Sequence, residues 1–474
     1  MNLAFSATFL RAAAEHGIAE PELRRQLSRL QGTPSFCTPD SPCTPGQGIQ
    51  RWSDAEFRRW SALGASIEAS RVVRFVPASG AASRMFKALV GQDSAAKDQL
   101  NARWEEFPFR EAAEAVAPCD TPESRWSAVI ERLDLPSKPK GALPFHVEPD
   151  GIKTAFEAQM IEWSRTLDAP GAPLHFTLPA EGMAAHLHAI QTLAERMGIP
   201  VEASIQEPAT DTVALDEAGA PFVKADGTPL FRPGGHGALL HNLGAIARRH
   251  HGALVSVKNI DNVRPTSALH EVVPWRQALI GMASTLVDSR NEALTALEAG
   301  DVSPARNWLR KASAHPGETL PNDVDALRSA LDRPLLVAGM VQNEGEPGGG
   351  PFWLRDDEGT LRAQIVESAE MDTTDSAVRD RIGRATHFNP VDLVCALHDA
   401  HGQPYPLASF VDTTRDFLVS KSFGGRALTG LEHPGLWNGA MGRWNTAFVE
   451  VDPATFAPVK TVFDLLRPAH QWRE

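Results

Sequence analysis

The sequence predicts an α/β protein built on a mostly parallel, mixed sheet with helices on both faces. Short apolar runs, such as VVRFV at 72–76 and ALVSV at 253–257, alternate with longer segments of helical pattern. A polar or glycine-rich stretch follows several of these runs directly, as PASGAASR follows the first and KNIDN the second. Strands that alternate with helices form parallel sheets, and ligands bind beyond their carboxyl ends. We therefore expect these stretches to meet at one rim of the sheet.

The remaining elements follow from periodicity and from turn residues. Helical patterns at 1–32 and 53–70 flank a linker at 33–49 that is rich in Pro, Ser and Thr. Later apolar runs and helical patterns alternate, with strands expected at 174–178, 201–206, 253–261 and 333–343 and helices at 94–133, 180–197, 236–249 and 266–332. The expected organisation is a helical N-terminal segment with its linker (1–70), an α/β domain (71–375) with a helical insertion (266–332), and a C-terminal α+β region (376–474) packed on the core.

Composition narrows the class of protein. The chain has 474 residues, too many for one small core, and 46 basic against 59 acidic side chains give a net charge of −13. This charge argues against a nucleic-acid-coating protein. No apolar run approaches the roughly 20 residues of a membrane helix, and the N-terminus lacks the layout of a signal peptide. We expect a cytoplasmic protein that binds neither nucleic acid nor membrane, with its four cysteines free.

The stretch PASGAASRMFK has the properties of an anion-binding turn. Short side chains keep the backbone N–H groups accessible at Ser79, Gly80, Ala81, Ala82 and Ser83. A helix after such a turn would direct its positive end toward the same place, and Arg84 suits bidentate contact with phosphate. The alternative is a tight strand-to-helix turn with a surface arginine. No GxxxxGK[ST] pattern is present, so this is not a P-loop.

Three further stretches carry candidate residues. Lys140 lies in SKPKGALPFH, where prolines restrict the backbone. Asp261 lies in KNIDN, near the end of an expected strand, where a carboxylate suits Mg²⁺. The glycine-rich turn RPGGHGAL admits a close approach to a flat base or a sugar at Pro233, Gly234, Gly235, His236 and Gly237. The alternatives are a solvated lysine pair, a turn-forming aspartate and a turn that caps a helix.

The later part of the chain offers groups for a sugar. Acidic side chains and glycines at NEGEPGGGPFW and IVESAE could accept hydrogen bonds from hydroxyl groups and admit a ring, at Glu344, Glu346, Gly348 and Glu367. Lys421 stands beside a glycine pair in SKSFGGR, and Asn438 and Asn445 lie between tryptophans. A hairpin loop is the alternative for the acidic stretch, and core packing is the alternative for the tryptophans.

Taken together, these motifs resemble the sugar-phosphate nucleotidyltransferases, which are nucleotide-sugar pyrophosphorylases with a GT-A-like fold. The stretches PASGAASRMFK, RPGGHGAL, KNIDN and GEPGGGPFW resemble more closely a bacterial family with a domain of unknown function. The resemblance implies that Arg84 contacts a triphosphate, that Lys140 lies near the reacting phosphates and that Asp261 binds Mg²⁺. It also places Gln206 and the glycine-rich turn at a uracil base, and Glu367 at the sugar. The turn at 79–84 has one glycine where the pyrophosphorylases have two or three.

The implied activity is condensation of a nucleoside triphosphate, with UTP favoured, and a sugar-1-phosphate. The products are a nucleotide sugar and pyrophosphate, and Mg²⁺ is the implied cofactor. A glycosyltransferase on the same architecture is one alternative, although KNIDN lacks the second Asp of a DxD pair. A nucleotide- or sugar-binding protein without turnover is another, supported by the single glycine of the first turn.

Overall fold

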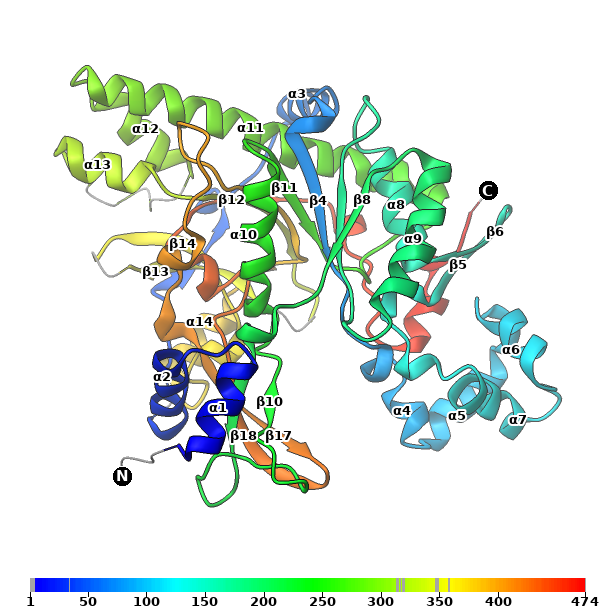
Figure 1. Ribbon diagram of the computed structural model, residues 1–474. Coiled ribbons are helices and arrows are strands. Elements are labelled where there is room, and N and C mark those ends of the chain that lie inside the picture. The colour runs from blue at the N-terminus through cyan, green and yellow to red at the C-terminus, as the bar shows by residue number, and fades with distance from the viewer. Residues whose placement is uncertain are drawn as a thin grey trace.

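A ten-stranded mixed sheet forms the centre of the molecule (Figure 1). The computed structural model describes residues 5–33, 35–312, 315, 317, 320–345, 349–356 and 359–473. The strands run in the order β2 (Thr44–Pro45), β3 (Gly48–Gln50), β19 (Asn445–Glu450), β12 (Leu335–Gln342), β16 (Asp392–Ala396), β11 (Leu254–Lys258), β4 (Val72–Pro77), β7 (Leu174–Thr177) and β8 (Val201–Ser204), and β15 (His387–Phe388) pairs with β12. The expectation of a mostly parallel, mixed sheet is confirmed.

Strand directions bring most carboxyl ends to one rim. Strands β11, β4, β7 and β8 pair in parallel, as do β12, β19 and β3. Strand β16 lies between β11 and β12 and is antiparallel to both, so those two strands also point the same way. The chain therefore leaves β4, β8, β11 and β12 at the same rim, and it enters β16 there.

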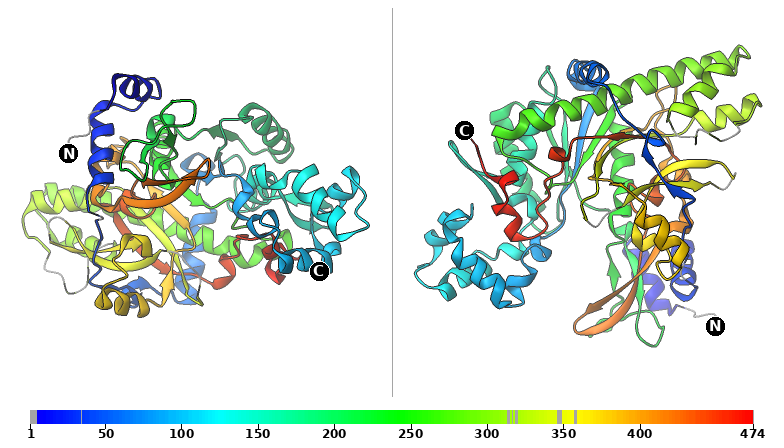
Figure 2. Two further views of the ribbon diagram at one scale, coloured as in Figure 1. Left: turned by 90° about the horizontal axis from the view of Figure 1, so that it is seen from below. Right: turned by 180° about the vertical axis from the view of Figure 1, so that it is seen from behind.

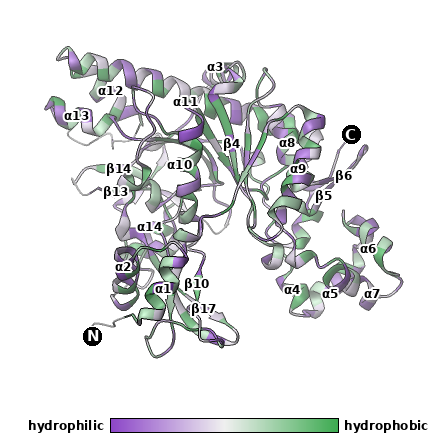
Figure 3. Ribbon diagram, viewed as in Figure 1, coloured by the Kyte–Doolittle hydropathy of each residue, from purple (hydrophilic) through white to green (hydrophobic). Residues whose placement is uncertain are grey.

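Helices cover both faces of the sheet because its central strands are apolar on both sides (Figure 3). On one face, α10 (Leu240–Arg249) packs against Val73, Phe75 and their neighbours. On the other face, Val72 and Val76 belong to a core that includes residues of α8 (Ala155–Ser164), α9 (Met183–Met197) and α11 (Leu269–Glu298). Helix α3 (Asp54–Ala65) packs closely on α11, since a Cβ on Gly64 would come within 1.8 Å of the Gln277 carbonyl oxygen.

Smaller units surround this core (Figure 2). Helices α1 (Ala7–Glu15) and α2 (Glu20–Gln31) pack on a four-stranded sheet of β10 (Phe231–Arg232), β9 (Thr212–Leu215), β18 (Arg426–Glu432) and β17 (Phe417–Phe423). The other strands are β1 (Ser41–Pro42), β13 (Gly350–Arg355) and β14 (Leu361–Val366) in one sheet, and β5 (Pro144–Glu148) and β6 (Gly151–Thr154) in a hairpin. The other helices are α4 (Lys87–Val90), α5 (Ser94–Ala102), α6 (Arg110–Val116), α7 (Pro122–Ser127), α12 (Ser303–Ala312), α13 (Val324–Leu331) and α14 (Ser376–Gly383).

The interpretation of residues 33–49 as linker was wrong in part. Strand β1 pairs with β13, and β3 extends the central sheet beside β19. Strand β1 has two residues, one of them a proline, and β3 has three, so their pairing depends on partners about 300 or more residues away. The region 376–474 likewise supplies β16 and β19 to the central sheet. All four cysteines are free, as expected. Within the described ranges, no helix combines the length and apolarity needed to cross a bilayer.

Candidate active site

Two of the predicted site residues are in direct contact at the rim. The Lys140 Nζ donates a hydrogen bond to Asp261 Oδ2 at 2.6 Å, and the two side chains are 17% and 21% exposed. Asp261 follows β11, whereas Lys140 begins a short 3₁₀ turn before β5. A cation and an anion from distant parts of the sequence therefore form one accessible pair.

The same lysine stretch is joined to the turn after β4. The Lys140 amide donates to the Gly80 carbonyl at 3.1 Å, and the Ala82 amide donates to the Lys138 carbonyl at 3.0 Å. A Cβ on Gly80 would meet no atom within 4 Å, so the outer side of the turn is open. The Arg84 side chain is exposed and has no hydrogen-bond partner among the described residues. The turn at 79–84, Lys140 and Asp261 thus occupy one part of the rim.

The expected helix after this turn is shorter than the sequence indicated. Residues Ala82–Arg84 form a 3₁₀ turn, and α4 has four residues, since Gly91 and Gln92 end it. A helix of one turn has a small dipole. Accessible amides and the Arg84 charge, rather than a helix terminus, are therefore what this turn offers to an anion.

Lys460, which the sequence reasoning missed, lies beside this group. The Val459 amide donates to the Asp261 carbonyl at 3.1 Å, and the Val462 amide donates to the Met85 carbonyl at 3.0 Å. Exposed Lys460 therefore lies on a segment that joins the Asp261 loop to the Arg84 turn. No motif in its stretch PVKTV distinguishes it from other exposed lysines, because Val459 separates the lysine from the preceding proline.

A buried ionic cluster holds the end of strand β11 that leads to the rim. Glu162 of α8 accepts hydrogen bonds from Arg74, Lys258 and Arg276, and Arg276 also pairs with Asp392. Burial alone would raise the pKa of Glu162, but the charges of Arg276, Lys258 and Arg74 hold it well below its usual range. Burial and the Arg276 charge lower the pKa of Lys258 to about 7. Because Lys258 ends β11, this cluster fixes the strand that leads to Asp261.

The glycine-rich turn encloses His236. Gly235 has a φ of 78°, and a Cβ on Gly237 would come within 2.1 Å of the Pro434 carbonyl oxygen, so glycine is required at both positions. The Leu436 amide donates to His236 Nδ1 at 3.0 Å, which places the proton of a neutral ring on Nε2. Burial lowers the pKa of His236 against the charges of Glu367 and Glu432.

Three polar side chains from distant segments meet at this turn. His236 Nε2 lies 3.7 Å from Glu367 Oε1, and the ring stacks on Trp437 with centroids 4.4 Å apart. Asn438 is 2% exposed, and neither atom of its amide has a partner among the described residues. A Cβ on Gly435 would lie 2.5 Å from His236 Cε1 and 2.8 Å from Asn438 Nδ2, so the two side chains are adjacent. We call His236, Glu367 and Asn438 the His236 cluster.

Two more side-chain NH₂ groups at the rim lack partners among the described residues. Gln206 follows β8, and its buried Nε2 has no hydrogen bond within the described ranges. Asn242 of α10 fixes the end of that strand, because its Nδ2 donates to the Ile205 carbonyl and to Ser204 Oγ, both at 2.8 Å. Asn389, missed from the sequence, precedes β16 and has a buried, unpartnered Nδ2. An unsatisfied buried amide marks a position where a ligand can supply the missing hydrogen bond.

The remaining candidates are not brought into these contacts. Glu344 is exposed after β12, and Glu346 and Gly348 lie outside the described residues. Lys421 lies in β17, in the four-stranded sheet rather than at the rim of the central sheet. Asn445 donates to the carbonyls of Ala330 and Leu331 at the end of α13. In the described part of the chain, no three His, Cys, Asp or Glu side chains are grouped as metal ligands.

A sequence comparison identifies the family. A family model described as a domain of unknown function, DUF4301, matches residues 7–115 and 128–471. The chain belongs to the DUF4301 family. No curated protein matches this DUF4301 chain in sequence.

Solved structures share the DUF4301 fold. The uridine diphosphate N-acetylglucosamine pyrophosphorylase of Trypanosoma brucei, in complex with an inhibitor, has a TM-score of 0.53 and 14% identity over 98% of this chain and 79% of that one. A variant of the UDP-glucose pyrophosphorylase of Leishmania major, in complex with UDP-glucose, has a TM-score of 0.49 and 13% identity over the same shares. The first likeness shows that the DUF4301 chain has the fold of a UDP-sugar pyrophosphorylase.

Proposed function

We propose that the protein is a Mg²⁺-dependent nucleotidyltransferase that condenses a nucleoside triphosphate, UTP in preference, with a sugar-1-phosphate. The observation that carries this proposal is the contact of Lys140 with Asp261 beside the open turn at 79–84. Such a pair puts a cation and a carboxylate that could bind a metal ion next to an open backbone turn. The pyrophosphorylase fold supports the same reaction class.

The reaction requires neutralisation of charge rather than a base. An oxygen of the sugar phosphate attacks the α-phosphorus, a new P–O bond forms, and the bond to the leaving pyrophosphate breaks. The attacking oxygen is already anionic, so no proton has to be removed from it. Arg84 belongs to the turn, Lys140 is hydrogen-bonded to it, and Lys460 lies on the segment that contacts Asp261 and Met85. Their positive charges would reduce the repulsion between the two substrates and help to align them.

Asp261 fits the requirements of a magnesium ligand. One of its oxygens pairs with Lys140, the other has no hydrogen bond in the described part of the chain, and the carboxylate is partly exposed. Mg²⁺ commonly takes one or two protein carboxylates and completes its shell with phosphate oxygens and water. When bound, the ion would supply charge stabilisation on the phosphates. Lys140 would orient the carboxylate for this role.

The unpartnered amides suit the organic parts of the substrates. Gln206 and the glycine-rich turn are our candidates for binding the base, because Asn242 joins the end of β8, before Gln206, to helix α10, which follows the turn. The His236 cluster offers a carboxylate, an N–H donor and an amide with both atoms unpartnered to the hydroxyl groups of a sugar. The 3.7 Å between His236 and Glu367 is longer than a hydrogen bond, which leaves a hydroxyl oxygen room to bridge them.

One observation favours a second candidate, a nucleotide-sugar-binding protein without turnover. Lys140 pairs directly with Asp261, and a carboxylate that remained neutralised in this way would leave a site that binds anions but does not take a metal. In that case the protein would retain nucleotide sugars without transferring the nucleotidyl group.

Incubation with each nucleoside triphosphate, a panel of sugar-1-phosphates and Mg²⁺ tests the proposal. We expect pyrophosphate release with UTP and one class of sugar phosphate, loss of release with EDTA, and recovery with added Mg²⁺. Binding of nucleotide sugar without pyrophosphate release would establish the second candidate. Release of a nucleoside diphosphate from a nucleotide sugar would instead indicate a glycosyltransferase.

A further inference from the structure

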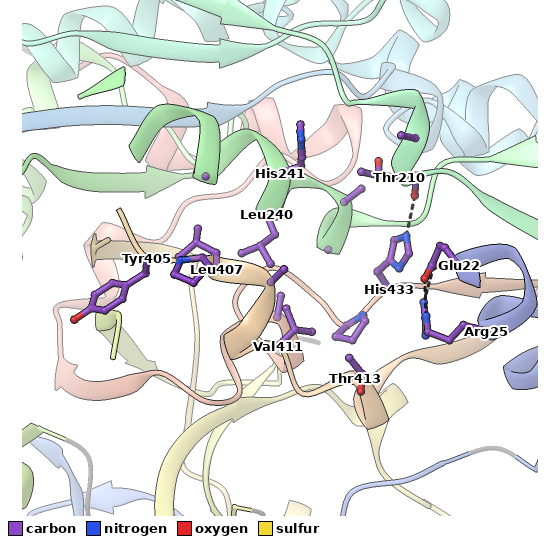
Figure 4. A pocket seen from close by; sticks show the side chains of 18 of the residues that line it. Glu22, Arg25, Thr210, Leu240, His241, Tyr405, Leu407, Val411, Thr413 and His433 are labelled. Carbon is purple, nitrogen blue, oxygen red and sulfur yellow. Dashed lines mark hydrogen bonds and ion pairs between the residues drawn. The ribbon is translucent and has the colours of Figure 1, made fainter. Parts of the chain in front are cut away.

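A cavity lies behind the glycine-rich turn, on the side of α10 that faces away from the central sheet. Its volume is about 490 Å³, within the range of small-molecule sites. Helix α2, helix α10 and the segment 405–413 form its walls (Figure 4). The residues described as lining it include neither the turn at 79–84 nor the loop at 259–262. This cavity is therefore separate from the turn at 79–84 and the Asp261 loop, although Gly237 of the glycine-rich turn forms part of its wall.

The interior of this cavity is apolar. Leu240 of α10 faces Leu407 and Val411 across it, and Pro434 closes the wall next to His433 (Figure 4). Gly244 leaves a recess in the wall, since a Cβ there would meet only Arg248 Nη1 at 3.4 Å and Leu407 Cδ1 at 3.8 Å. An apolar body of moderate size would fill this space without moving the backbone.

The charge at the wall is positive. The guanidinium of Arg248 lies over Gly244 and has no partner within the described ranges. The other strong charges are compensated, because Glu22 accepts from Arg25 and Gln26, and Arg25 also pairs with Asp416. An unpaired arginine beside an apolar recess matches a ligand with an apolar body and one anionic group.

The walls also connect this cavity to the candidate active site. Gly237 and Ala238 line the cavity and directly follow His236, whose ring belongs to the His236 cluster. His433 lines it as well, and its Nε2 donates at 2.8 Å to the Thr210 carbonyl, four residues after Gln206. A ligand in the cavity would contact the reverse side of both segments that are candidates for binding the base.

We propose that this cavity is an effector site for a small amphipathic carboxylate, whose anionic group pairs with Arg248 and whose apolar body packs on Leu240, Leu407 and Val411. Occupancy restrains the glycine-rich turn from behind. The site binds its ligand whether or not the proposed reaction occurs, because Arg248, Leu240, Leu407 and Val411, which would contact the ligand, lie outside the residues proposed to bind the substrates.

Direct binding to the full-length protein tests the site. The probes are anilinonaphthalene sulfonate, followed by its fluorescence, and decanoate, followed by displacement of that dye, with decanol as the uncharged comparison. We expect one dye molecule bound per chain and displacement by decanoate at least about tenfold better than by decanol. Decanoate should also slow amide hydrogen exchange in residues 234–240.

Matched variants locate the binding. Gly244→Leu fills the recess and should weaken dye binding at least about tenfold, and Arg248→Gln should remove the preference for decanoate over decanol. The controls are Gly383→Leu, at an open helical glycine, and Arg58→Gln, at an exposed arginine of α3, which should bind as the parent does. Thermal unfolding verifies that each variant is folded. Equal binding by the parent and Gly244→Leu, or no dye binding by the parent, would overturn the proposal.

Discussion

Lys140 Nζ lies 2.6 Å from Asp261 Oδ2, although 121 residues separate them in the chain. This pair is the clearest sign that the rim of the sheet is an organised site. Its side chains are partly exposed, and such pairs contribute only about 0–1 kcal/mol to stability. The pair is therefore explained better by a role toward a ligand than by a role in folding.

Replacing either member of this pair should affect turnover and leave folding intact. We expect Asp261→Asn and Lys140→Met to lower the rate of pyrophosphate release by at least about 100-fold, because each removes a charge that the transferring phosphates require. Lys138→Met and Asp168→Asn are exposed controls that should retain the parent rate. Steady-state kinetics with thermal unfolding curves checks this; parent-like rates in the first two variants would remove both residues from the mechanism.

Arg84 should matter because of its position at the rim. Arg84→Ala removes an exposed cation from the turn after β4, and we expect about a 100-fold loss of turnover without a change in unfolding temperature. Arg71→Ala is the matched control, because Arg71 is an exposed arginine just before the opposite end of the same strand. A loss of equal size in both variants would mean that general surface charge, rather than this position, is responsible.

Replacing Asn438 should weaken binding of the sugar phosphate without changing the binding of UTP. Asn438→Ala should raise KM for the sugar phosphate by about tenfold, one hydrogen-bonded group's worth, and leave KM for UTP unchanged. Because the amide has no protein partner in the described part of the chain, its removal should not lower the unfolding temperature. Asn307→Ala, at an exposed position of α12, is the control. If KM for both substrates rose together, Asn438 would instead have a structural role.

The buried cluster predicts a large effect on stability. Glu162→Gln removes the anion that Arg74, Lys258 and Arg276 share, and it leaves three cations to one remaining carboxylate, Asp392. Breaking a buried pair typically costs about 3–5 kcal/mol. Urea unfolding should report a loss of this size in the free energy of unfolding. Glu195→Gln, at an exposed position of α9, should change that free energy little. A loss below about 1 kcal/mol would mean that the cluster rearranges around a neutral side chain.

Two buried histidines predict a loss of stability in acid. His470 Nδ1 lies 3.1 Å from His146 Nε2 in β5, and burial and the Arg264 charge lower the pKa of His470 to about 4. A histidine with a lowered folded pKa contributes stability above its unfolded pKa of about 6.5 and loses it as the pH falls toward 4. The free energy of unfolding should therefore fall in that window, by up to about 1.4 kcal/mol per pH unit for each such histidine.

The control for this effect is a histidine in solvent. His470→Leu should flatten the decline between pH 6.5 and 4, and His188→Leu, at an exposed position of α9, should not. Urea titrations at several pH values compare the three proteins. An unchanged slope in His470→Leu would assign the acid sensitivity to other groups.

The sheet was predictable from the sequence because its strands are buried on both faces. Runs such as 72–76 and 253–257 read as strands for this reason, and the residues after them reach the rim as expected. Residues 41–50 did not read as strands, because β1 and β3 are short and depend on pairing with Trp353 and Phe448.

The site was predictable where its residues follow a strand directly. Asp261 and Arg84 met this condition. Lys460 did not, because backbone hydrogen bonds to Asp261 and Met85 bring it to the rim. Asn389 and Asn438 could not be distinguished from other asparagines in the sequence, since what marks them is the lack of partners inside a packed structure.

The segment at 458–462 has a consequence for biosynthesis. A nascent chain emerges from its N-terminal end, so the turn at 79–84 and the loop at 259–262 leave the ribosome long before the residues that join them. All strands of the central sheet are made earlier, and Val459 and Val462 join the two halves of the rim only after the last of them, β19, has been synthesised. A product truncated near Asp452 would retain every strand of that sheet but lack this joint together with Lys460, and we expect it to lack the proposed activity.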